Sequence, residues 1–165
     1  MRPNLPIPIP LAPASFLLSR LMRGMAGRHP AILRRLGPHA GARILLDVTD
    51  APFLLLMEPG RQRLSAHRRH RPPQAEAAIR GRLAGFLAML HGTEDGDALF
   101  FSGELEISGD TSAVLALRNA LDDAELDLTE ELVAETGRIG PALRHVTTLA
   151  ARVSGLQLSR QEASA

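Results

Sequence analysis

The sequence predicts a single α+β domain in which an antiparallel sheet packs against helices. Three short apolar segments, 42–48, 53–57 and 62–67, follow one another through tight links, as consecutive antiparallel strands do. Segments with apolar residues at every third or fourth position precede and follow them, as in helices that face a core. With 165 residues, 45% of them hydrophobic, the chain is long enough to bury a core without disulfides or metals.

The composition excludes several classes of site. The chain has no Cys, Trp or Tyr, so it cannot form disulfides, thiolate zinc sites or cysteine-held iron–sulfur clusters of its own. Its six His form no HxxxH or HExxH pair, and the sequence contains no GxGxxG, Walker or GxSxG motif. We therefore expect no catalytic residues, no metal site and no cofactor.

Charge is distributed unevenly along the chain. Residues 1–82 hold 14 Arg against 4 acidic residues, whereas residues 83–165 hold 5 Arg against 14 acidic residues. This asymmetry indicates either a basic face that meets an anionic surface or two halves that neutralise each other in the fold. The most basic stretch, His67–Arg71, could contact phosphate, but it lacks a groove-reading motif and stacking aromatics. We interpret it as a solvated loop and expect no nucleic-acid partner.

The N-terminal region is expected to contain an extended arm followed by two helices. Residues 1–13 carry proline at nearly every second position, which disfavours a helix and is unlike a signal peptide, so we expect a cytoplasmic protein. Residues 14–38 are predicted to form a basic amphipathic helix over 14–25, with Ser15, Ser19 and Arg23 on its polar side, and a short helix over 31–36. The first helix either packs on the core or lies on a membrane surface, through Leu18, Arg20, Leu21, Met22, Arg23 and Met25.

The remaining elements follow from periodicity and turn residues. Residues 75–80 fit a strand or a helix equally well, 83–91 form a helical stripe, and 92–97 form an acidic loop. A half-buried strand covers 104–107, Gly109 makes a turn, and Asp110 or Thr111 caps a helix that ends near Leu121. Thr129 begins another helix that Gly137 breaks, and 142–156 form a last helix before a polar tail.

The segment Phe101-Ser102-Gly103-Glu104-Leu105-Glu106-Ile107-Ser108-Gly109-Asp110 resembles the signature of the sterol carrier protein type lipid-binding domain. That resemblance implies a non-enzymatic domain over residues 39–128, followed by C-terminal helices and a tail over 129–165. It also implies a strand over 75–80 and a five-stranded, mainly antiparallel sheet covered by helices, which enclose an apolar lipid tunnel. The residues expected to line this tunnel are Leu46, Phe53, Leu55, Phe86, Leu90, Phe101, Leu105, Ile107 and Leu115.

Within this family, the chain is similar to accessory factors of oxygen-independent ubiquinone biosynthesis. The similarity is carried by Leu99-Phe100-Phe101, Gly109-Asp110-Thr111, the segment 117–122 and Glu125. It implies that polyprenylated ubiquinone precursors are the ligands and that iron–sulfur hydroxylases are the partners. It also implies that the basic N-terminal helix either docks on the inner membrane or covers the mouth of the tunnel. A general phospholipid or fatty-acid carrier is the alternative, and an Arg-mediated nucleic-acid-binding module is a third hypothesis.

Overall fold

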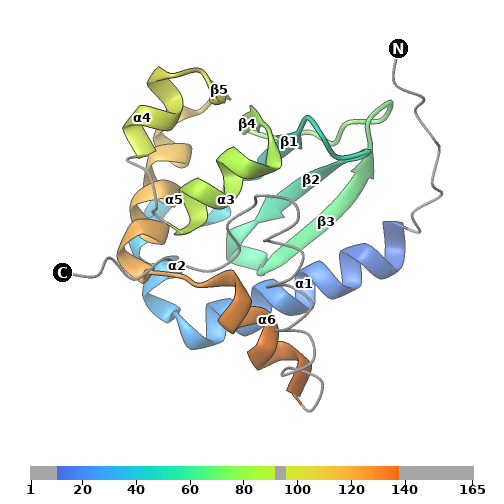
Figure 1. Cartoon of the computed structure of the whole chain (residues 1–165), viewed down its shortest axis with the longest axis vertical. Coiled ribbons are helices and arrows are strands. Elements are labelled where there is room, and N and C mark those ends of the chain that lie inside the picture. Colours follow the sequence, from blue (N-terminus) through green and yellow to red (C-terminus); the bar gives the residue numbers. More distant parts are fainter. Residues whose placement is uncertain (1–10, 92–95, 138–165) are drawn as a thin grey trace.

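The computed structural model describes residues 11–91 and 96–137 (Figure 1). Two helices precede the first strand, two helices separate the fourth strand from the fifth, and two helices follow the fifth. The elements in chain order are α1 (Leu11–Arg28), α2 (Pro30–Leu36), β1 (Ile44–Val48), β2 (Phe53–Glu58), β3 (Arg63–Arg68), β4 (Ala77–Gly81), α3 (Leu83–His91), α4 (Gly96–Phe101), β5 (Leu105–Gly109), α5 (Thr111–Ala124) and α6 (Leu128–Thr136). Short 3₁₀ turns at Gly37–Gly41 and Pro59–Arg61 lead into β1 and β3.

The five strands form one mixed sheet in the order β3-β2-β1-β4-β5. The three strands predicted as an antiparallel meander pair in that way, β1 with β2 and β2 with β3. Residues 77–81 form a strand, as the family resemblance implies, and this strand pairs parallel to β1 and antiparallel to β5. The prediction of a five-stranded α+β fold is confirmed, with one parallel pairing because the chain crosses from the β3 edge back to β1.

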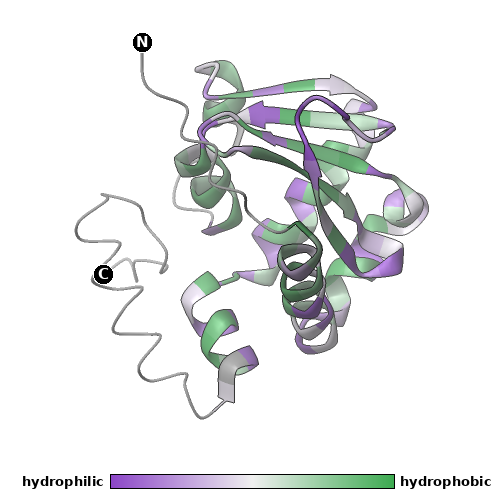
Figure 2. Cartoon of the chain, turned by 90° about the vertical axis from the view of Figure 1, so that its right-hand side faces the viewer, coloured by the Kyte–Doolittle hydropathy of each residue, from purple (hydrophilic) through white to green (hydrophobic). Residues whose placement is uncertain are grey.

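One face of the sheet is covered by helices: α5 contacts β4 and β5, α4 contacts β5, and α2 and α3 pack against α5. The register places Leu46 of β1, Ile79 of β4 and Ile107 of β5 side by side on this face. Hydrophobic residues run along both the strands and the helices (Figure 2). The space between the two layers is filled by side chains that are 1% exposed or less, among them Leu36, Ile44, Ile79, Leu99, Leu105 and Val114.

Helix α1 closes the β3 edge of the sheet through two serine side chains. Ser19 Oγ donates to the carbonyl of Leu64 (2.9 Å) and accepts from its N–H (3.2 Å), while Ser15 Oγ accepts from the N–H of Ala66 (2.9 Å). The prediction that both serines lie on the outer, polar side of the helix is therefore wrong. An edge strand has unpaired backbone groups that need partners, and two hydroxyls one helical turn apart supply them.

The start of α1 and its outer face also differ from the sequence-based prediction. The helix begins at Leu11, so residues 11–13 of the predicted arm belong to it. Pro13 is tolerated because a first-turn residue needs no intrahelical N–H bond. The predicted stripe of Leu18, Leu21, Met22 and Met25 is half-buried, and the helix contacts α2, β3 and α6. Instead, Phe16 and Leu17 are the exposed large apolar residues of α1, at 62% and 63%.

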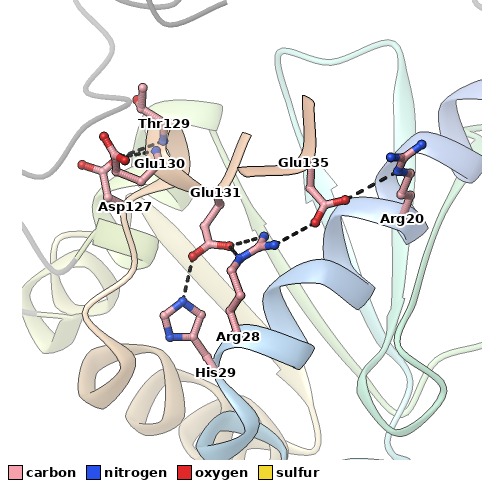
Figure 3. Close-up of polar contacts among 8 residues, drawn as sticks. All are labelled: Arg20, Arg28, His29, Asp127, Thr129, Glu130, Glu131 and Glu135. Atoms are coloured by element: carbon pink, nitrogen blue, oxygen red, sulfur yellow. Dashed lines mark hydrogen bonds and ion pairs between the residues drawn. The ribbon is translucent and has the colours of Figure 1, made fainter. Parts of the chain in front are cut away.

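Helix α6 is held on α1 by a cluster of charged side chains (Figure 3). The buried carboxylate of Glu131 accepts from Arg28 Nε at 2.8 Å and lies 2.7 Å from His29 Nε2. Glu135 accepts from Arg28 at 2.8 Å and forms an ion pair with Arg20 at 3.5 Å. The N-terminal end of α6 is capped by Asp127, which accepts from the N–H groups of Thr129 and Glu130. Arginines of the basic half thus neutralise acids of the acidic half, as one of the two charge hypotheses states.

This cluster shifts the pKa values of its members. The hydrogen bond from Arg28 lowers the pKa of Glu135 below its ordinary value of 4.5, against a smaller opposing effect of burial. Burial acts to lower the pKa of Arg28, but its hydrogen bonds to Glu135 and Glu131 outweigh burial and the net shift is upward. The native state therefore favours the ionised form of both groups.

Acidification is expected to weaken the attachment of α6 to α1. A carboxyl whose pKa is lowered by folding contributes stability above its unfolded pKa, and this contribution is lost as the pH falls through the folded pKa. For Glu135 the loss lies below 4.5, its unfolded value. Thermal unfolding from neutral pH down to about pH 3 should show a steeper loss of stability below about pH 4.5 in the natural chain than in Glu135→Gln. Glu104→Gln, at an exposed site, is the control, and parallel curves for natural chain and Glu135→Gln would contradict the assignment.

The basic segment after β3 has a structural role at one of its residues. Arg69 donates to Asp47 Oδ1 at 2.7 Å, to the carbonyl of Ala51 at 3.0 Å and to the carbonyl of Val48. Asp47 also accepts from Arg80 at 3.0 Å. Arg69 therefore stabilises the β1–β2 turn, and its guanidinium is occupied by protein groups rather than presented to a phosphate backbone.

Candidate functional site

An open pocket of about 280 Å³ lies between α4, β5 and α5. The pocket lies beside the strand and helix that carry the sequence signature, outside the filled core. Most of its lining is apolar, and its polar groups come from one face of α5. The lining residues are Phe100, Phe101, Ile107, Thr111, Ser112, Val114, Leu115 and Arg118.

A tight strand–turn–helix corner positions the pocket walls. Gly109 adopts a φ of +78°, which favours glycine, and a Cβ there would meet the carbonyl oxygen of Glu76 at 2.3 Å. Asp110 then caps α5 by accepting from the N–H groups of Ser112 (3.0 Å) and Ala113 (3.3 Å). The predicted turn and cap are confirmed, and they fix the angle between β5 and α5 that opens the pocket.

The apolar wall runs from a buried floor to an exposed rim. Val114 is 1% exposed, whereas Leu115 is 52% exposed and Phe101, at the end of α4, is 90% exposed. Large apolar side chains at a rim leave hydrocarbon in contact with water, a cost that an apolar ligand or partner would remove. The site is therefore suited to a hydrophobic molecule that enters from the surface.

The polar side of the pocket lies along α5. Thr111 and Ser112 are exposed in its first turn, and Arg118 follows two turns later, where its Nε lies 3.3 Å from Asp122 Oδ2. Hydroxyl groups donate and accept hydrogen bonds, and a guanidinium donates them. A ligand with an apolar body and a small oxygen-bearing head matches this combination of walls.

The structure brings together three of the nine predicted tunnel residues, Phe101, Ile107 and Leu115. Leu105 and Phe86 belong to the packed core, and Leu46 packs against it. Phe53, Leu55 and Leu90 are half-buried and do not line this pocket.

Five lining residues were missed by sequence reasoning, namely Phe100, Thr111, Ser112, Val114 and Arg118. Four of them could have been found from helical spacing. Counting from the Asp110 cap, Thr111, Leu115 and Arg118 fall at i, i+4 and i+7, on one face of α5, with Ser112 and Val114 at its borders.

The acidic loop predicted over 92–97 ends earlier than expected. Residues 92–95 lie outside the described residues, and α4 begins at Gly96. Residues 96–101 thus form a helix that ends in Phe100 and Phe101, which places both aromatic side chains beside β5 and α5.

The fold and the open apolar pocket define an α+β ligand-binding domain. The chain belongs to the SCP-2 sterol transfer family, whose model matches residues 22–122. No curated protein matches the chain.

Among solved structures, the chain is similar to a UbiJ-SCP2 ubiquinone synthesis protein, with a TM-score of 0.52 and 20% identity, covering 76% of this chain and 97% of that one. It is also similar to the apo form of sterol carrier protein 2 from Yarrowia lipolytica, with a TM-score of 0.48 and 13% identity, covering 73% and 98% of the two chains. At 20% identity, the similarity to the first of these two structures shows the fold.

Two further observations concern the described residues. Within residues 11–91 and 96–137, no three His, Asp or Glu side chains are grouped as a metal site would require. In the same ranges, no helix combines the length and the apolar character needed to cross a bilayer.

Proposed function

We propose that this chain is a non-enzymatic lipid carrier that serves oxygen-independent ubiquinone biosynthesis, as an accessory factor of the UbiT type. The observation that carries the proposal is the open pocket at α4, β5 and α5, with an apolar wall and a polar edge. Membership of the SCP-2 sterol transfer family supports lipid as the class of ligand. The similarity of the fold to a UbiJ-SCP2 ubiquinone synthesis protein supports the pathway.

The size of the pocket sets how much of a lipid it holds. Its volume of about 280 Å³ is close to the lower end of small-molecule sites, about 300–1,000 Å³. Each 100 Å² of apolar surface removed from water contributes about 2.5 kcal/mol before ordering costs. The pocket thus accommodates a head group with the first part of a polyprenyl tail, and the tail continues along the exposed rim of Phe101 and Leu115.

The carrier presents its ligand to other proteins in this proposal. Polyprenylated ubiquinone precursors occupy the pocket, and the partners are hydroxylases that hold their own iron–sulfur clusters. The protein works in the cytoplasm and meets the inner membrane to load its ligand, since a polyprenyl chain resides in a bilayer. The exposure of Phe101 on the pocket rim supports the expectation that a partner surface covers the ligand there during transfer.

A competition experiment tests the ligand class. The purified full chain is loaded with a fluorescent phospholipid and titrated with a short-chain ubiquinone precursor analogue. We expect the quinone analogue to displace the phospholipid at lower concentration than unlabelled phospholipid or fatty acid does. Equal or weaker displacement by the quinone analogue would favour the alternative, a general phospholipid or fatty-acid carrier, over the quinone assignment.

A further inference from the structure

The outer face of α1 presents two large apolar side chains that the described structure leaves uncovered. Phe16 and Leu17 are 62% and 63% exposed. Hydrogen bonds of Ser15 and Ser19 with the backbone of β3 fix the rotation of the helix about its axis, and both apolar side chains lie outside that serine side. Two adjacent exposed apolar residues on a fixed helix face form a small docking surface, which we call the Phe16–Leu17 face.

Helix α6 runs along α1 in the opposite direction and points toward this face. Glu131 contacts Arg28, and Glu135, one turn later, contacts Arg28 and Arg20 (Figure 3). The approach is closest at Gly24, where a Cβ would lie 1.7 Å from Glu135 Oε1. Each turn of α6 therefore moves the contact about one turn toward the N-terminal end of α1.

The described chain ends at 137, directly after α6, and so leaves the helix beside Arg20. Phe16 and Leu17 lie one turn beyond Arg20 in the same direction. The charge of Arg20 at this exit point is balanced by its ion pair with Glu135.

The sequence that follows has the pattern of a partner for an apolar surface. Residues 138–165 lie outside the described residues, and their sequence places Ala142, Val146, Leu149, Val153 and Leu156 at alternating spacings of four and three. That spacing is typical of one apolar face of a helix. A segment joined by a short linker is present at an effective concentration in the millimolar range, which favours it over a separate molecule for the same surface.

We propose that the segment 142–156 docks through its apolar face on the Phe16–Leu17 face of α1. The segment begins five residues after the last described residue, Gly137. A connection of that length spans up to about 17 Å, and the Phe16–Leu17 face begins one helical turn beyond Arg20, where the described chain leaves α6. In this arrangement α1 lies between β3 and the C-terminal segment. Ser15 and Ser19 contact the strand, and Phe16 and Leu17 contact the segment. The Phe16–Leu17 face is then unavailable to a lipid surface or to another protein while the segment is in place.

The absence of Cys from the natural chain makes a disulfide experiment selective. Leu17→Cys is combined in the full chain with Leu143→Cys, Val146→Cys or Leu149→Cys, and each double variant is oxidised at low protein concentration. A disulfide requires Cα atoms within about 7 Å, so we expect at least one Leu17 pair to close within a single chain. The matched control replaces Leu17→Cys by Glu104→Cys, at an exposed site on the pocket side of the molecule.

The outcomes separate the possible occupants. Intramolecular closure about tenfold faster for a Leu17 pair than for every Glu104 pair supports the proposal. Faster closure of the Glu104 pairs would place the segment over the pocket. Disulfides that form only between chains would indicate that a second copy occupies the face. If no disulfide forms, the segment does not occupy the face. Each of these three results overturns the proposal.

A second measurement does not depend on disulfide geometry. Labelling of Leu17→Cys by a maleimide should accelerate about tenfold when Val146→Asp and Leu149→Asp disrupt the apolar face of the segment. Labelling of Glu104→Cys should be unchanged by the same two substitutions, and an unchanged rate at Leu17→Cys would contradict the proposal. Lipid binding, measured on the same variants, is expected to stay unchanged because the pocket lies on α4, β5 and α5, so the two proposals fail independently.

Discussion

Replacing Gly109 by valine is expected to destabilise the protein by roughly 2–6 kcal/mol, from about 1–3 kcal/mol of backbone strain and about 1–3 kcal/mol of steric overlap. The strain arises because Gly109 has a φ of +78°. The overlap arises because a Cβ would lie 2.3 Å from the carbonyl oxygen of Glu76 and 3.1 Å from the Cα of Ala77. A loss of this size is a large part of the stability of an ordinary domain, about 5–15 kcal/mol.

Gly103→Val provides the matched control for this prediction. Gly103 has nearly the same φ, +77°, but no atom lies within 4 Å of a Cβ built on it. Urea unfolding followed by circular dichroism should therefore show a clearly smaller loss for Gly103→Val than for Gly109→Val. Equal losses would mean that the close approach of β5 to β4 does not contribute to the requirement for glycine.

Leu115→Asp is expected to weaken lipid binding by at least about thirtyfold, which corresponds to about 2 kcal/mol. Leu115 is half-exposed on the pocket rim, so a carboxylate there is solvated in the free protein. A bound hydrocarbon chain would remove that solvation, and burial of an unpaired charge costs several kcal/mol. Titration of the natural chain and the variant with a fluorescent phospholipid measures the difference.

Leu17→Asp is the control, since Leu17 is a leucine of similar exposure on α1, outside the pocket. We expect its affinity for the same probe to equal that of the natural chain. If both substitutions weaken binding alike, the effect is not specific to the pocket. If neither does, the lipid lies elsewhere in the protein.

The parts of the fold that depend on neighbouring residues could be predicted from the sequence. Gly109 and Asp110 specify a turn and a helix cap through their own backbone and side chain, and both are found in the structure. The meander of β1, β2 and β3 follows from alternation and short links. The strand over 77–81 could not be chosen by periodicity, and only the family resemblance indicated it.

Contacts between distant segments could not be predicted in this way. Ser19 and Leu64 are 45 positions apart, and helical periodicity assigns a serine to the polar side of α1. The serine side faces β3 instead because the strand edge needs hydrogen-bond partners, which leaves Phe16 and Leu17 outside. A sequence pattern distinguishes polar from apolar faces, but it does not show which of them meets an unpaired strand edge.

The candidate site shows the same difference between features set by neighbouring residues and features set by distant contacts. The three predicted residues that line the pocket, Phe101, Ile107 and Leu115, all come from the contiguous signature segment and the helix that follows it. Leu105 comes from the same segment but fills the core, and the other five were chosen as apolar residues of distant strands and helices. Apolar character alone does not separate a residue that lines an open space from one that fills a closed one.

The most direct test of the pocket as a lipid site is mass spectrometry of the lipid that copurifies with the full chain. The natural protein is predicted to carry a stoichiometric amount of an isoprenoid quinone precursor or a phospholipid, and Leu115→Asp is predicted to lose it while Leu17→Asp retains it. A natural chain that is folded and consistently free of lipid, or a Leu115→Asp variant that retains the full amount, would contradict the account.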